Sequence, residues 1–351
     1  MKSIHYPSIN GLRAISILFV ILGHIKLELY KIPYLSTIFK KFYFLTDGQL
    51  GVNIFFVISG FLITILLISE KEKHKSISIK NFYIRRVLRI FPAYYFLLLI
   101  YALLCILHII SIPIQSWLTA LTYTKYLNWQ LDWYTGHAWS LSIEEQFYLF
   151  WPLTFLLNKR TQIAIILLIL VACPLFRVYG IISEHTWNNG LTIFQRLDAI
   201  AIGCLAAFNY KVLTKFIVKA GHYIVIIVVL YFILFPYLEY INRVFSLHMN
   251  LFIVTFFGSF GTFTNLIILF LLIYSINIKN SIAFKLLNNK LLNFIGIISY
   301  SLYLWQQLFV ADTAFGMKIF PYNIILIILC SLISYYVIEK PFLKLKKKFS
   351  V

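Results

Sequence analysis

A histidine and a glutamate in two apolar stretches are the residues best suited to acid–base chemistry. His24 follows the run INGLRAISILFVILG, and Glu144 lies in HAWSLSIEEQFYLFWP. A carboxylate beside a histidine fixes the imidazole tautomer and stabilises the charged ring, which is the usual arrangement of a general base. A single histidine in an apolar helix is more often a hydrogen-bonded core residue. The two residues are nevertheless expected at the same membrane depth, which favours the catalytic interpretation.

Three arginines near the start of another apolar stretch form a second candidate group. Arg85, Arg86 and Arg89 lie in SISIKNFYIRRVLRIFPAYY at spacings that place them on one surface of a helix. A cytoplasmic anchor explains one or two such arginines. A cluster of three can instead clamp a phosphorylated ligand, because guanidinium groups match phosphate oxygens. This stretch alone does not decide between the two.

Further polar residues in apolar stretches are candidates for substrate binding or for structural contacts. Arg196 and Asp198 are two positions apart and do not face each other on a helix, so each needs another partner. Tyr303 and Gln306 lie in ISYSLYLWQQLF, a polar and aromatic helix face that lines a cavity as often as it packs. Asn53 is expected either to hydrogen-bond a neighbouring helix or to belong to a site.

The elements that carry these residues are predicted to span a membrane. Of the 351 residues, 61% are hydrophobic and 12% are charged, and the mean hydropathy is +0.85. Soluble domains are about half apolar and a quarter charged. The predicted fold is therefore an all-α integral membrane protein with about ten transmembrane helices and a single domain over residues 1–351. The predicted spans are Ile9–Ile25, Leu50–Ile68, Ile90–Ile110, Trp139–Leu157, Ile163–Ile182, Phe194–Phe208, Tyr223–Tyr240, Leu251–Ile276, Leu292–Ala311 and Tyr322–Ile338.

Charge sets the expected orientation. Most of the 31 Lys and Arg residues fall on one side of these spans, so the positive-inside rule places both termini in the cytoplasm. No small-residue cleavage site follows the first apolar run, which is interpreted as a retained span. The net charge of +19 is assigned to loops that face anionic lipid, and no nucleic acid partner is expected. Four isolated cysteines predict neither a metal site nor a disulfide.

Counting residues along the predicted helices sorts the polar residues into two layers. Arg13 and His24 share nearly one face of the first helix and lie about 16 Å apart along it. Arg13 falls at the cytoplasmic level together with the arginine cluster. The outer layer is expected about 5–8 Å from the opposite interface, and it contains His24, Asn53, Glu144, Asp198 and Gln306.

Several motifs together resemble the acyltransferase 3 family, the integral-membrane acyltransferases that modify bacterial surface sugars. The similarity covers nearly the whole chain in order. The matching stretches are NGLRAISILFVILGH (Asn10–His24), GVNIFFVISGFLI (Gly51–Ile63), FYIRRVLRIFPAYY (Phe82–Tyr95), WSLSIEEQFYLFWP (Trp139–Pro152), RLDAIAIGCLAA (Arg196–Ala207) and ISYSLYLW (Ile298–Trp305).

The resemblance implies ten spans with cytoplasmic termini in the bacterial cytoplasmic (inner) membrane. It implies transfer of an acyl group, usually acetyl from acetyl-CoA, to a hydroxyl of a glycan or lipid-linked sugar. It implies that His24 is the essential histidine of an Arg-x10-His pattern with Arg13. Arg86 and Arg89 are similar to a proposed coenzyme A contact, and Glu144 matches the acidic position. No metal or prosthetic group is expected beyond the acetyl-CoA donor.

Two departures from the family pattern are Asn53, where Asp is frequent, and Gln306, where His is frequent. The second departure leaves His24 as the sole predicted intramembrane base. Many relatives carry a fused extracytoplasmic domain. Here the chain ends soon after its last predicted span, so the expectation is a stand-alone form that acts alone, as a homo-oligomer or with a separate extracytoplasmic partner. The competing interpretation is a transporter or flippase of a lipid-linked glycan, with the polar layers as its path.

Overall fold

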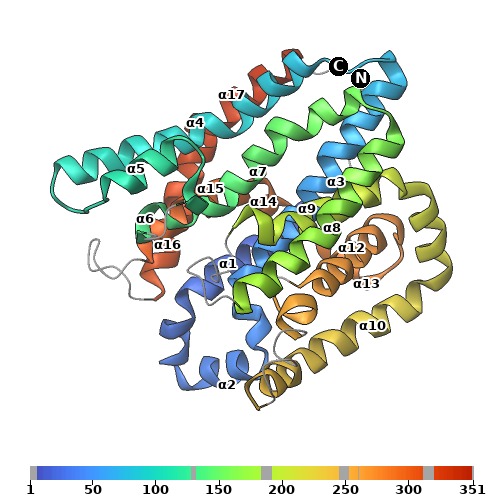
Figure 1. The fold of residues 1–351 in the computed structure, drawn as a ribbon. Coiled ribbons are helices and arrows are strands. Elements are labelled where there is room, and N and C mark those ends of the chain that lie inside the picture. Colours follow the sequence, from blue (N-terminus) through green and yellow to red (C-terminus); the bar gives the residue numbers. More distant parts are fainter. Residues whose placement is uncertain are drawn as a thin grey trace. The chain divides into compact units, whose positions relative to one another are not determined.

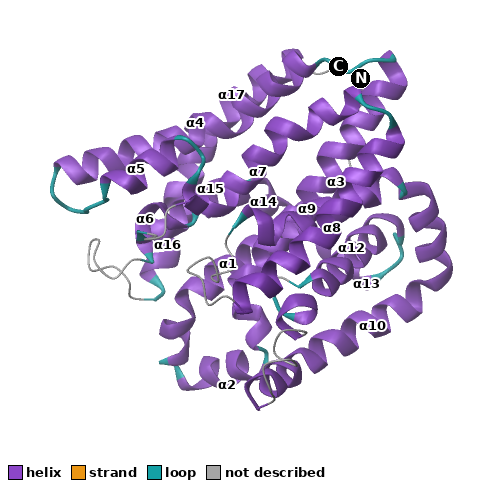
Figure 2. Cartoon of the chain, in the orientation of Figure 1, coloured by secondary structure: helices purple, strands orange, loops and turns teal. Residues whose placement is uncertain are grey.

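The structure is a computed structural model that describes residues 6–127, 132–182, 192–244, 253–259, 261–310 and 320–349. Every regular element in these ranges is a helix, and none of the residues described lies in a strand (Figure 2). The predicted all-α class is therefore confirmed. The helices group into two compact units, and the single domain over residues 1–351 stays a prediction.

The first unit comprises Met1–Lys26, Tyr30–Ser69 and Asn158–Ile297. Helices α8 and α9 pack along each other within it (Figure 1). Its elements are α1 (Ile9–Tyr30), α2 (Pro33–Lys41), the 3-10 helix η1 (Tyr43–Thr46), α3 (Gly48–His74), α8 (Lys159–Ile182), α9 (Ile193–Phe208), α10 (Tyr210–Val244), the π-helix η5 (Ile253–Phe257), α12 (Thr262–Asn277), α13 (Ile282–Leu287) and α14 (Lys290–Ile297).

Helix α3 packs backbone against backbone on two neighbours because it carries glycines at both crossings. A Cβ on Gly51 would lie 2.6 Å from the carbonyl oxygen of Ser16 in α1. A Cβ on Gly60 would lie 1.9 Å from the carbonyl oxygen of Ile200 in α9. Such contacts are impossible for any larger residue, and small residues at crossings are typical of membrane helices. The glycines therefore allow α3 to approach α1 and α9 closely.

The second unit comprises Leu27–Leu29, Glu70–Leu157 and Ile298–Val351. Its described residues form three 3-10 helices and one π-helix besides the α-helices. Its elements are α4 (Ile79–Ile106), α5 (Ile114–Leu121), η2 (Lys125–Leu127), α6 (Trp133–Gly136), α7 (Ala138–Phe150), the 3-10 helix η3 (Trp151–Leu156), α15 (Ser299–Phe309), α16 (Tyr322–Ile333), the π-helix η6 (Ser334–Glu339), α17 (Lys340–Lys346) and η7 (Lys347–Phe349).

Helix α4 begins earlier than predicted and is not restarted at its proline. Ser78 caps it by accepting a hydrogen bond from the backbone N–H of Asn81. The helix then continues through Pro92 to Ile106. The chain therefore stays helical through Pro92, and the arginines of this stretch lie inside the helix.

Within the residues that the structure describes, five helical segments are long and apolar enough to cross a membrane, and a sixth is formed if α9 and the start of α10, bent by 90°, count as one span. The five are α3, α4, α8, Thr255–Asn277 and Tyr322–Phe349. The total of ten spans and the cytoplasmic termini stay predictions. Two predicted span ends, Leu251 and Ala311, lie outside the described residues.

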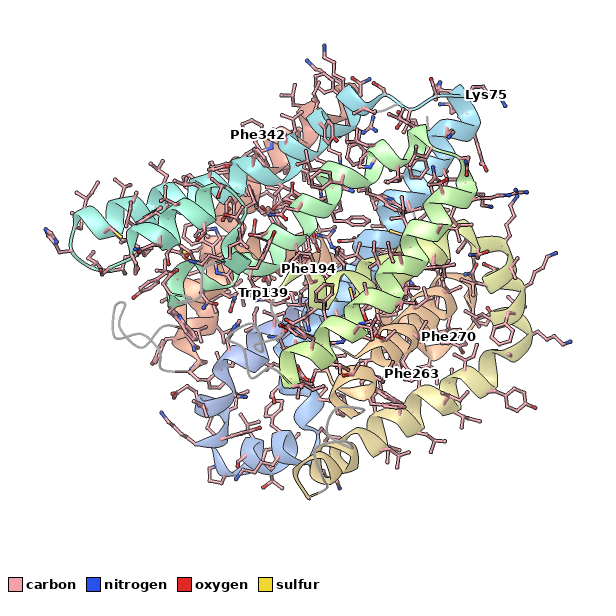
Figure 3. The ribbon with its side chains drawn as sticks, in the orientation of Figure 1. Lys75, Trp139, Phe194, Phe263, Phe270 and Phe342 are labelled. Carbon is pink, nitrogen blue, oxygen red and sulfur yellow. The ribbon has the colours of Figure 1, made fainter. Side chains whose placement is uncertain are left out.

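Large apolar side chains cover outward faces as well as the interior. Phe194 on α9 and Phe263 on α12 are 45% and 42% exposed (Figure 3). Exposed aromatic rings on apolar helices are expected where lipid replaces water as the solvent. The chain is accordingly treated as a multi-pass membrane protein.

Candidate active site

Arg86 on α4 is held against aromatic rings within the second unit. Its guanidinium carbon lies 4.2 Å from the centroid of the Tyr148 ring on α7. The Phe82 ring, one turn earlier on α4, is 5.7 Å away. A cation over a ring face is attracted by the ring quadrupole, and such contacts are worth about 0.5–1 kcal/mol at exposed sites and more when desolvated. This contact links the arginine helix directly to α7.

Tyr148, whose ring packs against Arg86, also hydrogen-bonds the predicted catalytic carboxylate of Glu144. The Tyr148 hydroxyl donates to Glu144 Oε2 at 3.2 Å. The two residues are four positions apart on α7, so they lie on the same face of the helix. Glu144 and Tyr148 are also electrostatic neighbours of Arg89. The structure therefore brings together Arg86, Arg89 and Glu144.

The prediction that Glu144 lies in a layer opposite the arginines is wrong. The depths of these side chains were counted from the ends of the predicted spans, and the observed helices begin and end elsewhere. Helix α4 starts at Ile79, so Arg86 and Arg89 lie two to three turns inside it. Helix α7 has 13 residues and gives way to a 3-10 helix at Trp151, so it is not the span of 19 residues from which the depth was counted.

Arg85 does not join the other two arginines. It donates to Glu70 Oε2 at 2.8 Å and to the carbonyl oxygen of Phe349 at 2.9 Å. Arg85 therefore ties the end of α3 and the basic C-terminal helices to α4. The prediction that three arginines share one surface is correct only for Arg86 and Arg89, which are electrostatic neighbours.

Two further carboxylates complete the group. Glu145 has Arg86, Arg89 and Glu144 as its charged neighbours. Glu339 accepts a hydrogen bond from the Ser301 hydroxyl at 2.9 Å and is an electrostatic neighbour of Arg89. The sequence analysis missed Glu339, although a single acid in the apolar run SYYVIE was a usable signal. The arginine–carboxylate cluster is defined here as Arg86, Arg89, Glu144, Glu145 and Glu339.

Neither arginine of this cluster is committed to a hydrogen bond within the part of the chain that the structure describes. Arg86 and Arg89 are both half-buried. The ion pairs within 4.0 Å in the described ranges involve other residues. Each guanidinium carries five N–H donors in a planar fork. The cluster therefore presents two adjacent, partly buried sets of donors that suit an anionic ligand.

The polar residues of α9 have structural partners in the first unit. Asp198 and Arg177 on α8 are each 1% exposed at the side chain and form an ion pair of 2.7 Å. Arg177 also donates to Thr262 Oγ1 at 2.6 Å. Arg196 donates to Gln49 Oε1 at 2.8 Å. The prediction that Arg196 and Asp198 each need another partner is confirmed. Arg177 was not predicted as the partner of Asp198, although an arginine in an apolar helix could have indicated it.

Asn53 on α3 donates hydrogen bonds to residues outside its own helix. Its side-chain amide donates to Asn265 Oδ1 at 2.8 Å and to the carbonyl oxygen of Ser259 at 3.0 Å. It is 1% exposed. Of the two interpretations left open by the sequence, these contacts favour hydrogen bonding between helices.

Arg13 and His24 lie on one continuous helix, α1, as predicted. Both are half-buried. A Cβ on Gly23 would lie 2.8 Å from the backbone nitrogen of Gly48, so His24 is level with the start of α3. His24 belongs to the first unit and Glu144 to the second, and their predicted pairing stays a prediction.

Tyr303 and Gln306 lie on α15 in the second unit. The Tyr303 hydroxyl is 2.6 Å from Ser140 Oγ and donates to the carbonyl oxygen of His137 at 2.7 Å. The His137 ring packs edge to face on Tyr303, with centroids 5.5 Å apart. Gln306 donates to Gln307 Oε1 at 3.1 Å. These contacts join α15 to the start of α7.

The described residues include no group of three or more His, Cys, Asp or Glu side chains that could hold a metal ion. The expectation of a metal-free enzyme stays a prediction.

A family model described as an acyltransferase domain matches residues 6–339. The chain belongs to the acyltransferase 3 family. A "Putative O-acetyltransferase" of Staphylococcus aureus strain COL is 29% identical over 388 residues, which cover 98% of this chain and 58% of that protein. The O-acetyltransferase OatA of S. aureus strain NCTC 8325 / PS 47 is 29% identical over 377 residues, or 97% of this chain and 57% of OatA. No solved structure matches the chain.

The matching family is one of acyltransferase domains, and the relatives reported above are named as O-acetyltransferases. The chain spans somewhat more than half the length of the relatives reported above. The donor, the acceptor and the roles of individual residues are therefore matters for proposal.

Proposed function

We propose that this protein transfers an acyl group, acetyl in the first instance, from acyl-CoA to a hydroxyl of a cell-surface or lipid-linked polysaccharide. The observation that carries the proposal is the pair of half-buried guanidinium groups of Arg86 and Arg89, which form no hydrogen bond or ion pair with the residues that the structure describes. Membership of an acyltransferase family and the names of the relatives support it. The setting is the bacterial cytoplasmic membrane, with both termini in the cytoplasm and membrane lipid around the spans.

The donor is bound through its phosphates. Arg86 and Arg89 supply charged N–H donors, and Arg13 on α1 is the third arginine that the sequence alone predicts to bind the donor. Hydrogen bonds between guanidinium groups and phosphate oxygens are short and can be bidentate. The ring of Tyr148 packs against the Arg86 guanidinium and positions it.

The reaction follows general base catalysis. His24 takes the proton of the acceptor hydroxyl, and the oxygen attacks the thioester carbonyl carbon. Glu144 is the carboxylate that the sequence predicts to orient His24. The new C–O ester bond forms, the C–S bond breaks, and the coenzyme A thiolate takes the proton back from His24. A covalent acyl-histidine or acyl-tyrosine relay is a variant of the same proposal.

Donor binding is tested with Arg86→Ala and Arg89→Ala in purified full-length protein. Loss of a hydrogen bond to a charged group costs about 1.5–3 kcal/mol, so the dissociation constant of acetyl-CoA should rise roughly 10- to 150-fold. Lys80→Ala is the matched control, because it removes an exposed positive charge from the same helix. Unchanged acetyl-CoA affinity in both arginine variants would contradict the donor assignment and leave the catalytic one standing.

Catalysis is tested with His24→Ala and Glu144→Gln in cells that lack the chromosomal gene. Alkali-released acetate from isolated surface glycan should fall to the level of the deletion strain for His24→Ala. Full acetylation by His24→Ala would defeat both the direct and the relay mechanism. Unchanged acetate content with altered polysaccharide export would point to the transporter or flippase. The same strains, with and without a co-expressed extracytoplasmic partner, show whether a partner or a homo-oligomer is needed.

A further inference from the structure

Glu145 on α7 is a carboxylate without a hydrogen bond in the part of the chain that the structure describes. Its Oε1 atom is buried and has no partner there, while the side chain as a whole is half-buried. Glu144 accepts a hydrogen bond from the Tyr148 hydroxyl at 3.2 Å, and Glu339 accepts one from the Ser301 hydroxyl at 2.9 Å. Such hydrogen bonds stabilise an ionised carboxylate. Glu145 is therefore the acid of the arginine–carboxylate cluster whose negative charge has the least support.

The charged groups that face Glu145 come from several helices. Arg86 and Arg89 on α4 are its positive neighbours, and Glu144, one position earlier on α7, is a negative one. Glu339 on η6 belongs to the same group as a neighbour of Arg89. The phenols that face Glu145 are those of Tyr95 on α4, Tyr123 before η2 and Tyr300 on α15. The cluster therefore holds two positive and three negative charges when every acid is ionised.

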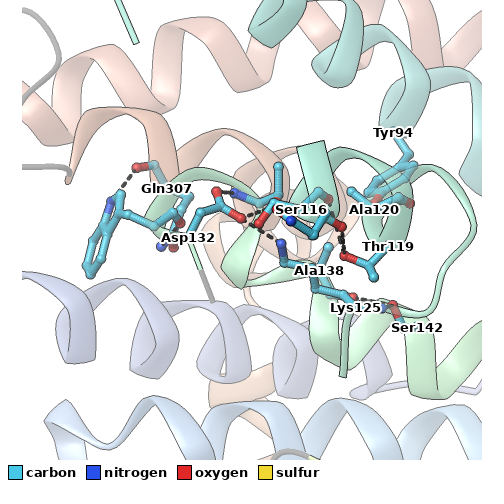
Figure 4. Close-up of polar contacts among 12 residues, drawn as sticks. Tyr94, Ser116, Thr119, Ala120, Lys125, Asp132, Ala138, Ser142 and Gln307 are labelled. Carbon is cyan, nitrogen blue, oxygen red and sulfur yellow. Dashed lines mark hydrogen bonds and ion pairs between the residues drawn. The ribbon is translucent and has the colours of Figure 1, made fainter. Parts of the chain in front are cut away.

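The lysine of η2, a short helix that packs on α7, is already paired with a carboxylate outside the cluster. Lys125 is fully buried, and its ammonium lies 2.6 Å from Asp132 Oδ2 (Figure 4). Asp132 also accepts a hydrogen bond from the backbone N–H of Thr135 at 2.8 Å. The 3-10 helix η3, which packs on α7 as well, has no titratable side chain. Neither short helix offsets the excess negative charge of the cluster.

An anionic ligand on the two arginines changes the balance at Glu145. Phosphate oxygens accept hydrogen bonds from the guanidinium groups, so the ligand takes the positive charge that favours the ionised form of Glu145. Burial and the charge of Glu144 then remain, and both favour the neutral form. A buried carboxyl group that lacks a counter-charge takes up a proton, because ionisation without a partner is too costly.

We propose that Glu145 must carry a proton for a phosphate-bearing donor to bind to Arg86 and Arg89. If the carboxyl is ionised in the free protein, donor binding takes up one proton from solvent, and release of the donor returns it. The affinity for the donor then falls as the pH rises, because each ionised Glu145 adds a negative charge beside the phosphate. The inference rests on the proposed donor binding and assigns Glu145 as the residue that sets the charge of that site.

The test measures the binding of two anions, acetyl-CoA and inorganic pyrophosphate, to full-length protein in lipid nanodiscs. Dissociation constants are determined from about pH 7 to about pH 9, where arginine stays charged and phenols stay neutral. The proteins are the wild type, Glu145→Gln and the control Glu72→Gln, which removes an exposed carboxylate of the second unit. Glutamine has the shape of a protonated glutamate and does not ionise. Titration of the ligand affects all three proteins equally, so it cancels in the ratio of their dissociation constants.

We expect the dissociation constant of the wild type to rise with pH relative to that of Glu145→Gln. The ratio should increase by up to about tenfold per pH unit, because one proton is linked to binding. Glu72→Gln should follow the wild type. A ratio that stays constant over the whole pH range is the result of a purely structural role of Glu145 and would overturn the proposal.

The two probes separate this proposal from the donor assignment. Binding of pyrophosphate without binding of acetyl-CoA would count against acyl-CoA as the donor, while the pyrophosphate ratio would still decide the role of Glu145. Binding of acetyl-CoA with a constant ratio would support the donor assignment and refute the proton linkage. A wild type that binds neither anion would contradict both.

Discussion

Replacing Asp198 by Asn should strongly destabilise the first unit. Asp198 and Arg177 are buried together, with side chains 1% exposed and their charged atoms 2.7 Å apart. Thr262 donates to the same carboxylate oxygen at 2.8 Å. Asparagine keeps the volume of the side chain, so the substitution removes charge and leaves packing nearly unchanged.

The expected loss of stability follows from Arg177, which keeps its buried positive charge when Asp198 is replaced. Arg177 would keep its bonds to the carbonyl oxygen of Gln195 at 2.7 Å and to Thr262 at 2.6 Å, but it would lose its counter-charge. Breaking one partner of a buried ion pair costs about 3–5 kcal/mol. For a unit of this size we expect the unfolding midpoint to fall by on the order of 10 °C.

The double variant Arg177→Met with Asp198→Leu is the decisive comparison. It removes both charges and fills the space with apolar groups, and such replacements of buried pairs are often neutral or stabilising. Thermal unfolding in one detergent, followed by intrinsic fluorescence and by size-exclusion recovery, should rank the double variant above Asp198→Asn. Equal midpoints for the wild type and Asp198→Asn would refute the reasoning. Normal stability with a raised acceptor KM would instead assign Asp198 to substrate binding.

Three further predictions test contacts elsewhere. Tyr148→Leu should weaken acetyl-CoA binding about 2- to 5-fold by removing the ring under Arg86, whereas Tyr148→Phe should not, as equilibrium binding will show. Gly60→Ala should cost at least about 1–3 kcal/mol in thermal unfolding, because its Cβ would meet a carbonyl oxygen of α9, while Gly136→Ala meets nothing within 4 Å and should be neutral. Burial raises the pKa of Asp132, but hydrogen bonds from its lysine and threonine partners outweigh burial and hold that pKa below its ordinary value. The stability from this group should therefore be complete above about pH 4 and be lost as the pH falls further, and a midpoint that is flat between about pH 5 and 2 would contradict this.

The sequence by itself determined features that depend on local helix geometry. Composition placed the chain among membrane proteins, and spacing on one helix placed Arg86 beside Arg89. It also placed Arg13 on the helix of His24. These relations hold because the rise and turn of an α-helix are nearly constant, so residues three or four apart meet in any structure that contains the helix.

Only the tertiary structure decided which helices share their polar groups. Arg177 pairs with Asp198 across 21 residues, and Glu339 comes close to Arg89 from the far end of the chain. Arg85, adjacent to Arg86 in sequence, turns to Glu70 instead. Such contacts depend on where one helix starts and how far it slides along another, as the short α7 and the early start of α4 demonstrate. A shift of a few residues along a helix moves a side chain by several ångströms, and the local sequence pattern does not reveal that shift.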